Sequence, residues 1–113
     1  MNKRTVGAET EERAVRFLQE QGYCPVMQNY RCRLGEIDII AEEDGALVFL
    51  EVKYRRTTAY GLPEQAVDAR KQMKIRKIAM WYAAQNRIPA DRPMRFDVVA
   101  MDEREIRIYK NAF

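Results

Sequence analysis

The sequence contains no histidine and only two cysteines, Cys24 and Cys32, among its 113 residues. A zinc site is therefore excluded, because two cysteines cannot supply the four ligands that structural zinc requires. No apolar run approaches the roughly 20 residues of a membrane span, and the basic start lacks the apolar stretch of a secretory signal. We therefore expect a cytoplasmic protein in which both cysteines are ordinary small side chains.

The length supports a single domain, residues 1–113, with a core that buries about two-thirds of the unfolded surface. The net charge is only +3, but the basic residues gather in stretches on either side of an acidic centre. This pattern is typical of a site that acts on a polyanion such as nucleic acid. Taken alone, the basic run at residues 70–77 fits a solvated helix face equally well. The candidate nucleic-acid contacts are Arg31, Arg33, Arg55, Arg56, Arg70, Lys71, Lys74 and Lys77.

Two neighbouring segments that otherwise have the composition of buried strands, residues 35–42 and 46–54, carry charged side chains. The Asp-Gly dipeptide at residues 44–45 predicts a two-residue hairpin turn between them. The turn sets the register, and alternation along a strand then places the charged residues on one face. The pairs expected on that face are Asp38 opposite Glu51 and Glu36 opposite Lys53.

The acidic pair across this hairpin requires a compensating cation or proton. Like charges directly opposed in a ladder destabilise it, and Lys53 is the one positive charge predicted nearby. Residues 36–51 contain six acidic side chains and no basic side chain. Oxygen ligands of this kind suit Mg²⁺ or Mn²⁺, so Asp38 and Glu51 are the expected metal ligands. The alternative is a half-exposed strand pair whose polar face lies in water.

Helical periodicity predicts one helix over residues 8–21 and a second over residues 64–86. In the first helix Glu11 shares the apolar face. It is either a part of the site or a first-turn residue that complements the helix dipole. In the second helix Met73, Met80 and Trp81 are interpreted as packing residues.

Further strands are expected at residues 23–30, 94–101 and 105–110. The resulting order, α-β-β-β-α-β-β, predicts an α/β domain of the α+β layered type, with a central mixed sheet flanked by helices. Asp97 has no visible partner and is interpreted as structural. The sequence permits a homodimer. The strand at residues 94–101 or the strand at 105–110 could form the contact between subunits through an apolar edge, or it could equally be part of the core.

Asp38 followed by Glu51-Val52-Lys53 resembles the motif of the PD-(D/E)xK nuclease superfamily, which has the restriction-endonuclease-like fold. More narrowly, the chain resembles the YraN-like family of small bacterial proteins, which is similar to archaeal Holliday-junction resolvases. The resemblance implies that Asp38 and Glu51 bind a metal, with Glu11 assisting, and that Lys53 activates water or stabilises phosphate charge. The residues that carry the narrower resemblance are Gly7, Glu11, Ala14, Gly22-Tyr23, Asn29-Tyr30-Arg31, 35–38, 49–55, Gly61, Pro63, Lys71 and 96–99.

Together these patterns predict a Mg²⁺- or Mn²⁺-dependent nuclease that hydrolyses phosphodiesters in DNA. Basic side chains that grip phosphates favour recognition of DNA shape, such as a branch or an end, over reading of bases. The expected partner is therefore DNA and not a membrane. One alternative is a nucleic-acid-binding or adaptor protein that uses the same scaffold without catalysis. Another is a protein-interaction module whose basic helix docks an acidic or membrane-associated partner.

Overall fold

The computed structural model describes residues 3–54 and 67–113, and the side chains from residue 9 onward. Within these residues the element order is the predicted one. The first residues of the helix predicted over 64–86, residues 64–66, lie outside the described residues. The elements are α1 (Lys3–Glu20), β1 (Cys24–Cys32), β2 (Gly35–Glu43), β3 (Ala46–Tyr54), α3 (Ala69–Gln85), β4 (Met94–Met101) and β5 (Ile106–Tyr109).

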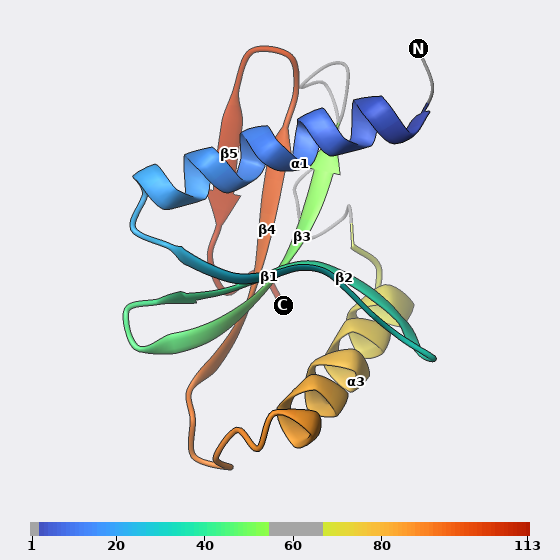
Figure 1. The fold of residues 1–113 in the computed structure, drawn as a ribbon, viewed down its shortest axis with the longest axis vertical. Helices are drawn as coiled ribbons and strands as arrows, with labels where there is room; N and C mark the ends of the chain where they lie inside the picture. Colours follow the sequence, from blue (N-terminus) through green and yellow to red (C-terminus); the bar gives the residue numbers. More distant parts are fainter. Residues whose placement is uncertain (1–2, 55–66) are drawn as a thin grey trace.

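The five strands form one mixed sheet in the order β1-β2-β3-β4-β5 (Figure 1). Only β3 and β4 run parallel, because α3 connects them as a crossover, and the other neighbours are antiparallel. The predicted α+β layered class is confirmed, and the architecture is compatible with a restriction-endonuclease-like fold. Since β4 is an interior strand, residues 94–101 are not a contact edge, whereas β5 does lie at the edge of the sheet.

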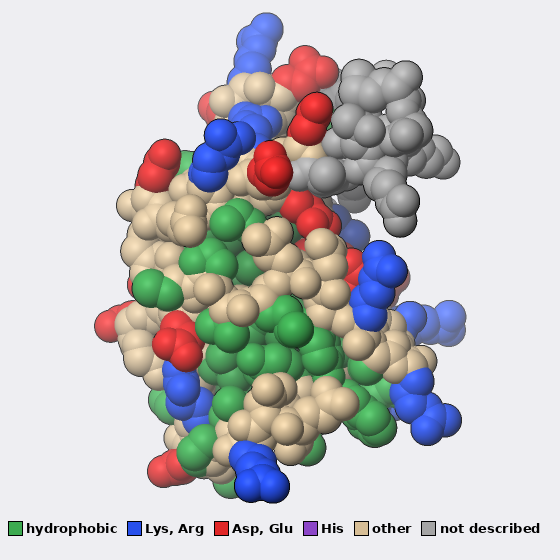
Figure 2. Space-filling model, in the orientation of Figure 1, with side chains coloured by type: hydrophobic (Ala, Val, Ile, Leu, Met, Phe, Trp, Pro, Cys, Tyr) green, Lys and Arg blue, Asp and Glu red, His purple; other side chains and the backbone are tan. Residues whose placement is uncertain are grey.

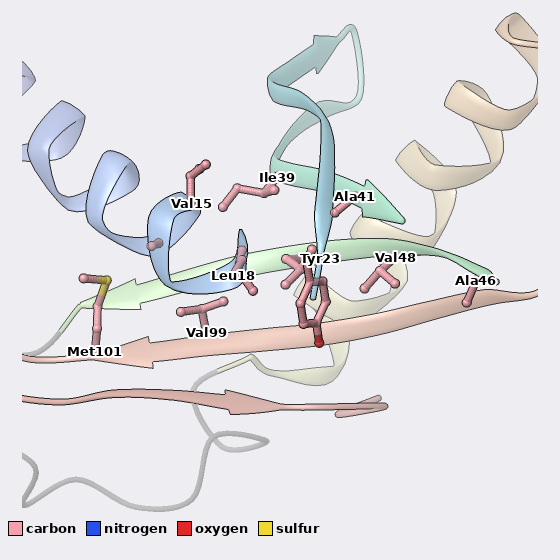
Figure 3. Close-up of a cluster of buried hydrophobic side chains, with 11 residues drawn as sticks. Val15, Leu18, Tyr23, Ile39, Ala41, Ala46, Val48, Val99 and Met101 are labelled. Carbon is pink, nitrogen blue, oxygen red and sulfur yellow. The ribbon is translucent and has the colours of Figure 1, made fainter. Parts of the chain in front are cut away.

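Helices cover both faces of the sheet, and the alternation along β3 shows this directly. Val48 and Leu50 belong to a cluster completed by α1 (Figure 3), whereas Leu47 and Phe49 belong to a cluster completed by α3. Alternate side chains of a strand point to opposite faces, so β3 contributes residues to the hydrophobic clusters on both faces of the sheet. From the helices, Ala14, Val15 and Leu18 complete the first cluster, and Ile75, Ile78, Ala79 and Tyr82 complete the second.

The start of α3 differs from the sequence prediction because of a cap. Asp68 has an extended backbone, with φ −71° and ψ 170°, and its carboxylate accepts a hydrogen bond of 2.8 Å from the amide of Lys71. An N-cap of this kind marks the start of a helix, and Val67 and Asp68 are not helical, so α3 begins at Ala69 and the helix predicted over residues 64–86 is not continuous. In the described parts of the chain, no helix combines the length and the hydropathy that crossing a membrane requires.

Three apolar side chains of α3 do not pack in the core as expected. Met73, Met80 and Trp81 are 60%, 63% and 39% exposed, so their interpretation as packing residues is wrong. The helix turns its other side, with Ile75 and Ile78, to the sheet.

The predicted hairpin register is confirmed for residues 39–43 and 46–50. The β2–β3 ladder pairs Ile39 with Leu50 and continues to the pair of Glu43 and Ala46. The two turn residues, at positions 44 and 45, have φ of +52° and +79°, the left-handed conformation of a type I′ turn.

Asp97 is fully buried, and its interpretation as structural is confirmed. Its carboxylate accepts hydrogen bonds from the hydroxyl of Tyr23 at 2.7 Å, from Arg95 at 2.8 Å and from the amide of Asn111 at 2.9 Å. Arg95 also donates to Glu43 at 2.8 Å. Burial, together with the hydrogen bond to Asp97, raises the pKa of Tyr23 well above its usual value, so the hydroxyl remains a donor.

Candidate functional site

The site lies where β2 and β3 separate. Their ladder ends at the pair of Ile39 and Leu50, so Asp38 and Glu51 are not ladder partners as predicted, nor are Glu36 and Lys53. Instead, Oδ2 of Asp38 accepts a hydrogen bond of 2.8 Å from the amide of Val52. The aspartate side chain therefore replaces a backbone acceptor and ties the diverging strands together.

Three carboxylates from two elements converge beside this point. Glu11 on α1 and Glu36 and Asp38 on β2 each place an oxygen within 4.8 Å of the others. Asn29 donates a hydrogen bond of 2.8 Å to Glu11, and Arg31 pairs with Glu36 at 3.1 Å. Neighbouring groups therefore orient two of the three acids. We call Glu11, Glu36 and Asp38 the acidic trio.

The position of Glu11 decides between its two interpretations. Because α1 begins at Lys3 and not near residue 8, its first turn contains no acidic side chain. Glu11 lies more than two turns from that end, and the helix dipole acts mainly on the first turn. The dipole interpretation is therefore wrong, and Glu11 lies with the strand carboxylates.

Glu51 is almost completely buried, at 7% exposure, and is not a member of the acidic trio. Its Oε1 lies 3.7 Å from Nζ of Lys53 and 3.3 Å from Nζ of Lys71. Sequence reasoning assigned Lys71 to nucleic-acid contact alone. Its ion pair with Glu51 shows that α3 also supplies a positive charge to the acidic strands.

Two members of the acidic trio, Glu36 and Asp38, border one hollow together with Glu51. It has a volume of about 300 Å³ and lies between the strands and α3. Glu51 and the trio members Glu36 and Asp38 therefore share a single space, as the predicted common face requires. The residues around it are Glu36, Asp38, Glu51, Lys71, Lys74, Ile75 and Ile78.

The surroundings of Asp38 disfavour its ionised form. Burial, followed by the charge of Glu51, raises its pKa to about 7, although the hydrogen bond from Val52 opposes the shift. Glu11 and Glu36 add smaller repulsions in the same direction. Negative charge at this point is therefore insufficiently compensated by the protein, and a cation would relieve it.

The predicted nucleic-acid contacts do not form one cluster. Arg31 and Arg33 are exposed at the β1–β2 hairpin, and Arg31 pairs with Glu36 there. Arg70, Lys74 and Lys77 are exposed on α3. Figure 2 shows basic side chains projecting at the edge of the molecule where α3 lies. Arg55 and Arg56 lie outside the described residues.

Sequence reasoning missed two contributors to the site. Glu36 was placed on the correct face but was expected opposite Lys53, and Asn29 entered only through the family resemblance. The approach of Asn29 to Glu11 joins β1 to α1, so no local pattern could have predicted it.

The family model described as "Uncharacterised protein family UPF0102" matches residues 10–101. The chain belongs to the UPF0102 family. The UPF0102 protein of Lachnoclostridium phytofermentans is 52% identical over the whole chain and 96% of that relative. The UPF0102 protein of Alkaliphilus oremlandii is 45% identical over the full length of both chains. That of Syntrophus aciditrophicus is 47% identical over 91% of this chain and 84% of its own. The YraN-like family membership predicted from the sequence is confirmed.

Proposed function

We propose that this UPF0102 protein is a divalent-metal-dependent nuclease that hydrolyses DNA phosphodiesters and recognises a branch or an end by its shape. One observation carries the proposal: the acidic trio has its oxygens within 4.8 Å of one another, beside a hollow that Glu51 also borders. Like charges this close destabilise the fold unless a cation or proton lies between them. The pKa of Asp38 is raised first by burial and then by the negative charge of Glu51, with smaller contributions from Glu11 and Glu36, so a cation beside this carboxylate would be favoured.

The donor set fits Mg²⁺ or Mn²⁺, since every candidate ligand is a carboxylate oxygen. Asp38 belongs to the acidic trio and borders the hollow with Glu51, so these two residues would hold the ion, with Glu11 or Glu36 beside them. When bound, the ion supplies a water of lowered pKa and polarises a phosphate oxygen.

The lysines contribute positive charge where a phosphate would lie. Lys53 and Lys71 are both within ion-pair distance of Oε1 of Glu51. In the proposed reaction Lys53 orients the attacking water or stabilises negative charge on the phosphate. Lys71 and Lys74, on the α3 side of the hollow, would bind the neighbouring phosphate.

A second candidate is a nucleic-acid-binding or adaptor protein without catalysis. It is favoured by the two lysines at Glu51, because they already compensate this carboxylate without a metal. Binding of DNA that Glu51→Gln leaves unchanged, with no cleavage by the wild type, would select this function.

The nuclease proposal is tested with duplex, branched and single-stranded DNA in Mg²⁺ or Mn²⁺. We expect wild-type cleavage of at least one substrate, and a loss of roughly 100-fold or more in Asp38→Asn and Lys53→Met. Calorimetry should show weaker Mn²⁺ binding by Asp38→Asn. Glu12→Gln, which changes an exposed acid one residue from Glu11, is the matched control. No cleavage of any substrate, with equal Mn²⁺ binding by wild type and Asp38→Asn, would refute the proposal.

A further inference from the structure

One side of α3 carries a row of exposed residues that the proposed reaction does not use in full. Arg70, Lys74, Lys77 and Trp81 follow one another at intervals of four, three and four residues. Residues at these intervals lie on the same side of a helix. We call these four residues the α3 stripe. Trp81 is 39% exposed, and the three basic residues are also exposed.

The α3 stripe begins at the acidic site. Lys74 borders the hollow together with Asp38 and Glu51, so it belongs both to the site and to the stripe. Trp81 is seven residues further along the helix, which corresponds to about 10 Å of axial rise. The stripe therefore leads away from the acidic hollow towards an aromatic side chain.

The net positive charge of α3 favours a polyanion as the binding partner of the α3 stripe. The helix contains five basic residues and no acidic one. Lys71 pairs with Glu51, and Arg76 lies over the ring of Phe96 at 4.8 Å. In the described parts of the chain, no carboxylate lies within ion-pair distance of the three basic residues of the stripe. Among the described residues, therefore, no carboxylate neutralises these three charges.

The exposed indole of Trp81 distinguishes between the kinds of polyanion that could bind, because it offers a surface for stacking. Basic side chains next to an exposed aromatic ring are typical of surfaces that bind single-stranded nucleic acid. Inside a duplex both faces of each base are covered by neighbouring bases, so away from the duplex ends a tryptophan gains a stacking partner from an unpaired base. An acidic polypeptide would satisfy the lysines without engaging the ring in this way.

We propose that the α3 stripe binds an unpaired strand of nucleic acid, with phosphates at Lys74 and Lys77 and a base stacked on the indole of Trp81. The inference rests on the proposed function and adds that the substrate has a single-stranded segment next to the scissile bond.

Trp81 is the only tryptophan of the chain, so intrinsic fluorescence reports on it alone. The metal-free wild-type protein is titrated with an oligothymidine, with a blunt duplex of equal length and with polyglutamate. We expect saturable, salt-sensitive quenching by the oligothymidine and little change with the other two. Equal quenching by duplex or by polyglutamate would overturn the proposal, as would oligothymidine binding without quenching.

Variants test the same contact by anisotropy of a labelled oligothymidine. Trp81→Ala should weaken binding at least about fivefold, whereas Trp81→Phe should retain most of it. Met80→Ala is the matched control, since Met80 is adjacent in the helix, 63% exposed and outside the stripe. Unchanged binding by Trp81→Ala, or an equal loss in Met80→Ala, would overturn the proposal. If Trp81→Ala does not fold, as judged by circular dichroism, the quenching titration and Trp81→Phe decide.

The two proposals fail in different ways. Cleavage in Mg²⁺ without any quenching by oligothymidine would overturn the role of the α3 stripe and leave the nuclease proposal intact. Quenching by oligothymidine without cleavage of any substrate would support the stripe and contradict the nuclease proposal.

Discussion

At the scale of single residues, Asp38 controls the electrostatics of the site. Its pKa is raised to about 7, first by burial and then by Glu51. In the unfolded chain an aspartate has a pKa of about 3.9, so the folded state binds this proton more tightly. Between about pH 4 and pH 7 the folded protein carries more protons at this position, and its stability falls as the pH rises through that window.

We therefore predict that Asp38→Asn removes a pH-dependent loss of stability. In metal-free buffer the free energy of unfolding of the wild type should fall more steeply from about pH 4 to pH 7 than that of the variant. Near pH 8 the variant should be more stable, by up to about 4 kcal/mol. Urea denaturation at a series of pH values measures both slopes.

Added Mg²⁺ provides the control, because an ion that binds only the folded state stabilises it. The wild type should gain stability in Mg²⁺, and Asp38→Asn should gain much less. Parallel pH profiles for the two proteins would contradict the predicted role of Asp38.

At the scale of elements, the packing of the β1–β2 hairpin against α3 depends on Gly35. Its φ is +143°, a conformation that is almost restricted to glycine. A Cβ at this position would lie 2.8 Å from Cε of Lys74 and 3.2 Å from Cδ1 of Ile78. A side chain here would displace the flexible end of Lys74 and press against Ile78, in addition to straining the backbone.

Gly35→Ala should destabilise the protein by about 2–4 kcal/mol, through backbone strain and the displacement of Lys74 and Ile78. Gly45→Ala is the matched control, since Gly45 has φ +79° but no atom within 4 Å of an added Cβ. It should cost about 1–2 kcal/mol from strain alone. Chemical denaturation measures both values, and equal losses would show that the contact with α3 does not contribute.

At the scale of the whole molecule, the buried network around Asp97 joins distant parts of the chain. It links Tyr23 ahead of β1 with β4 and with Asn111, which follows β5. Arg95 extends it to Glu43 at the end of β2. The network stabilises the fold at a place remote from the acidic trio.

Asp97→Ala should therefore lower the free energy of unfolding by about 3–5 kcal/mol, because it leaves the buried hydroxyl of Tyr23 without its acceptor and Arg95 with Glu43 as its remaining carboxylate partner. Glu105→Ala, which removes an exposed ion pair of 3.0 Å with Arg107, should change it by no more than about 1 kcal/mol. Urea denaturation compares the two variants. A loss below about 1 kcal/mol for Asp97→Ala would show that water replaces the network without cost.

The resemblance of the chain's motif residues identified the family. Local patterns in the sequence were sufficient for the element order and for the register of the acidic hairpin as far as the pair of Ile39 and Leu50. These features depend on side-chain periodicity and on turn residues such as Asp44 and Gly45, which act over a few positions. The same patterns placed the helix starts incorrectly, because propensity does not show where Asp68 supplies a cap.

The composition of the site depended on contacts between distant segments. Folding brought Glu11 of α1 to Asp38, set Lys71 of α3 against Glu51, and left Trp81 exposed beside the basic row. Periodicity predicts which side of a helix is apolar, but the packing of α1 and α3 on the sheet determines which charges meet and which aromatic side chain remains in solvent.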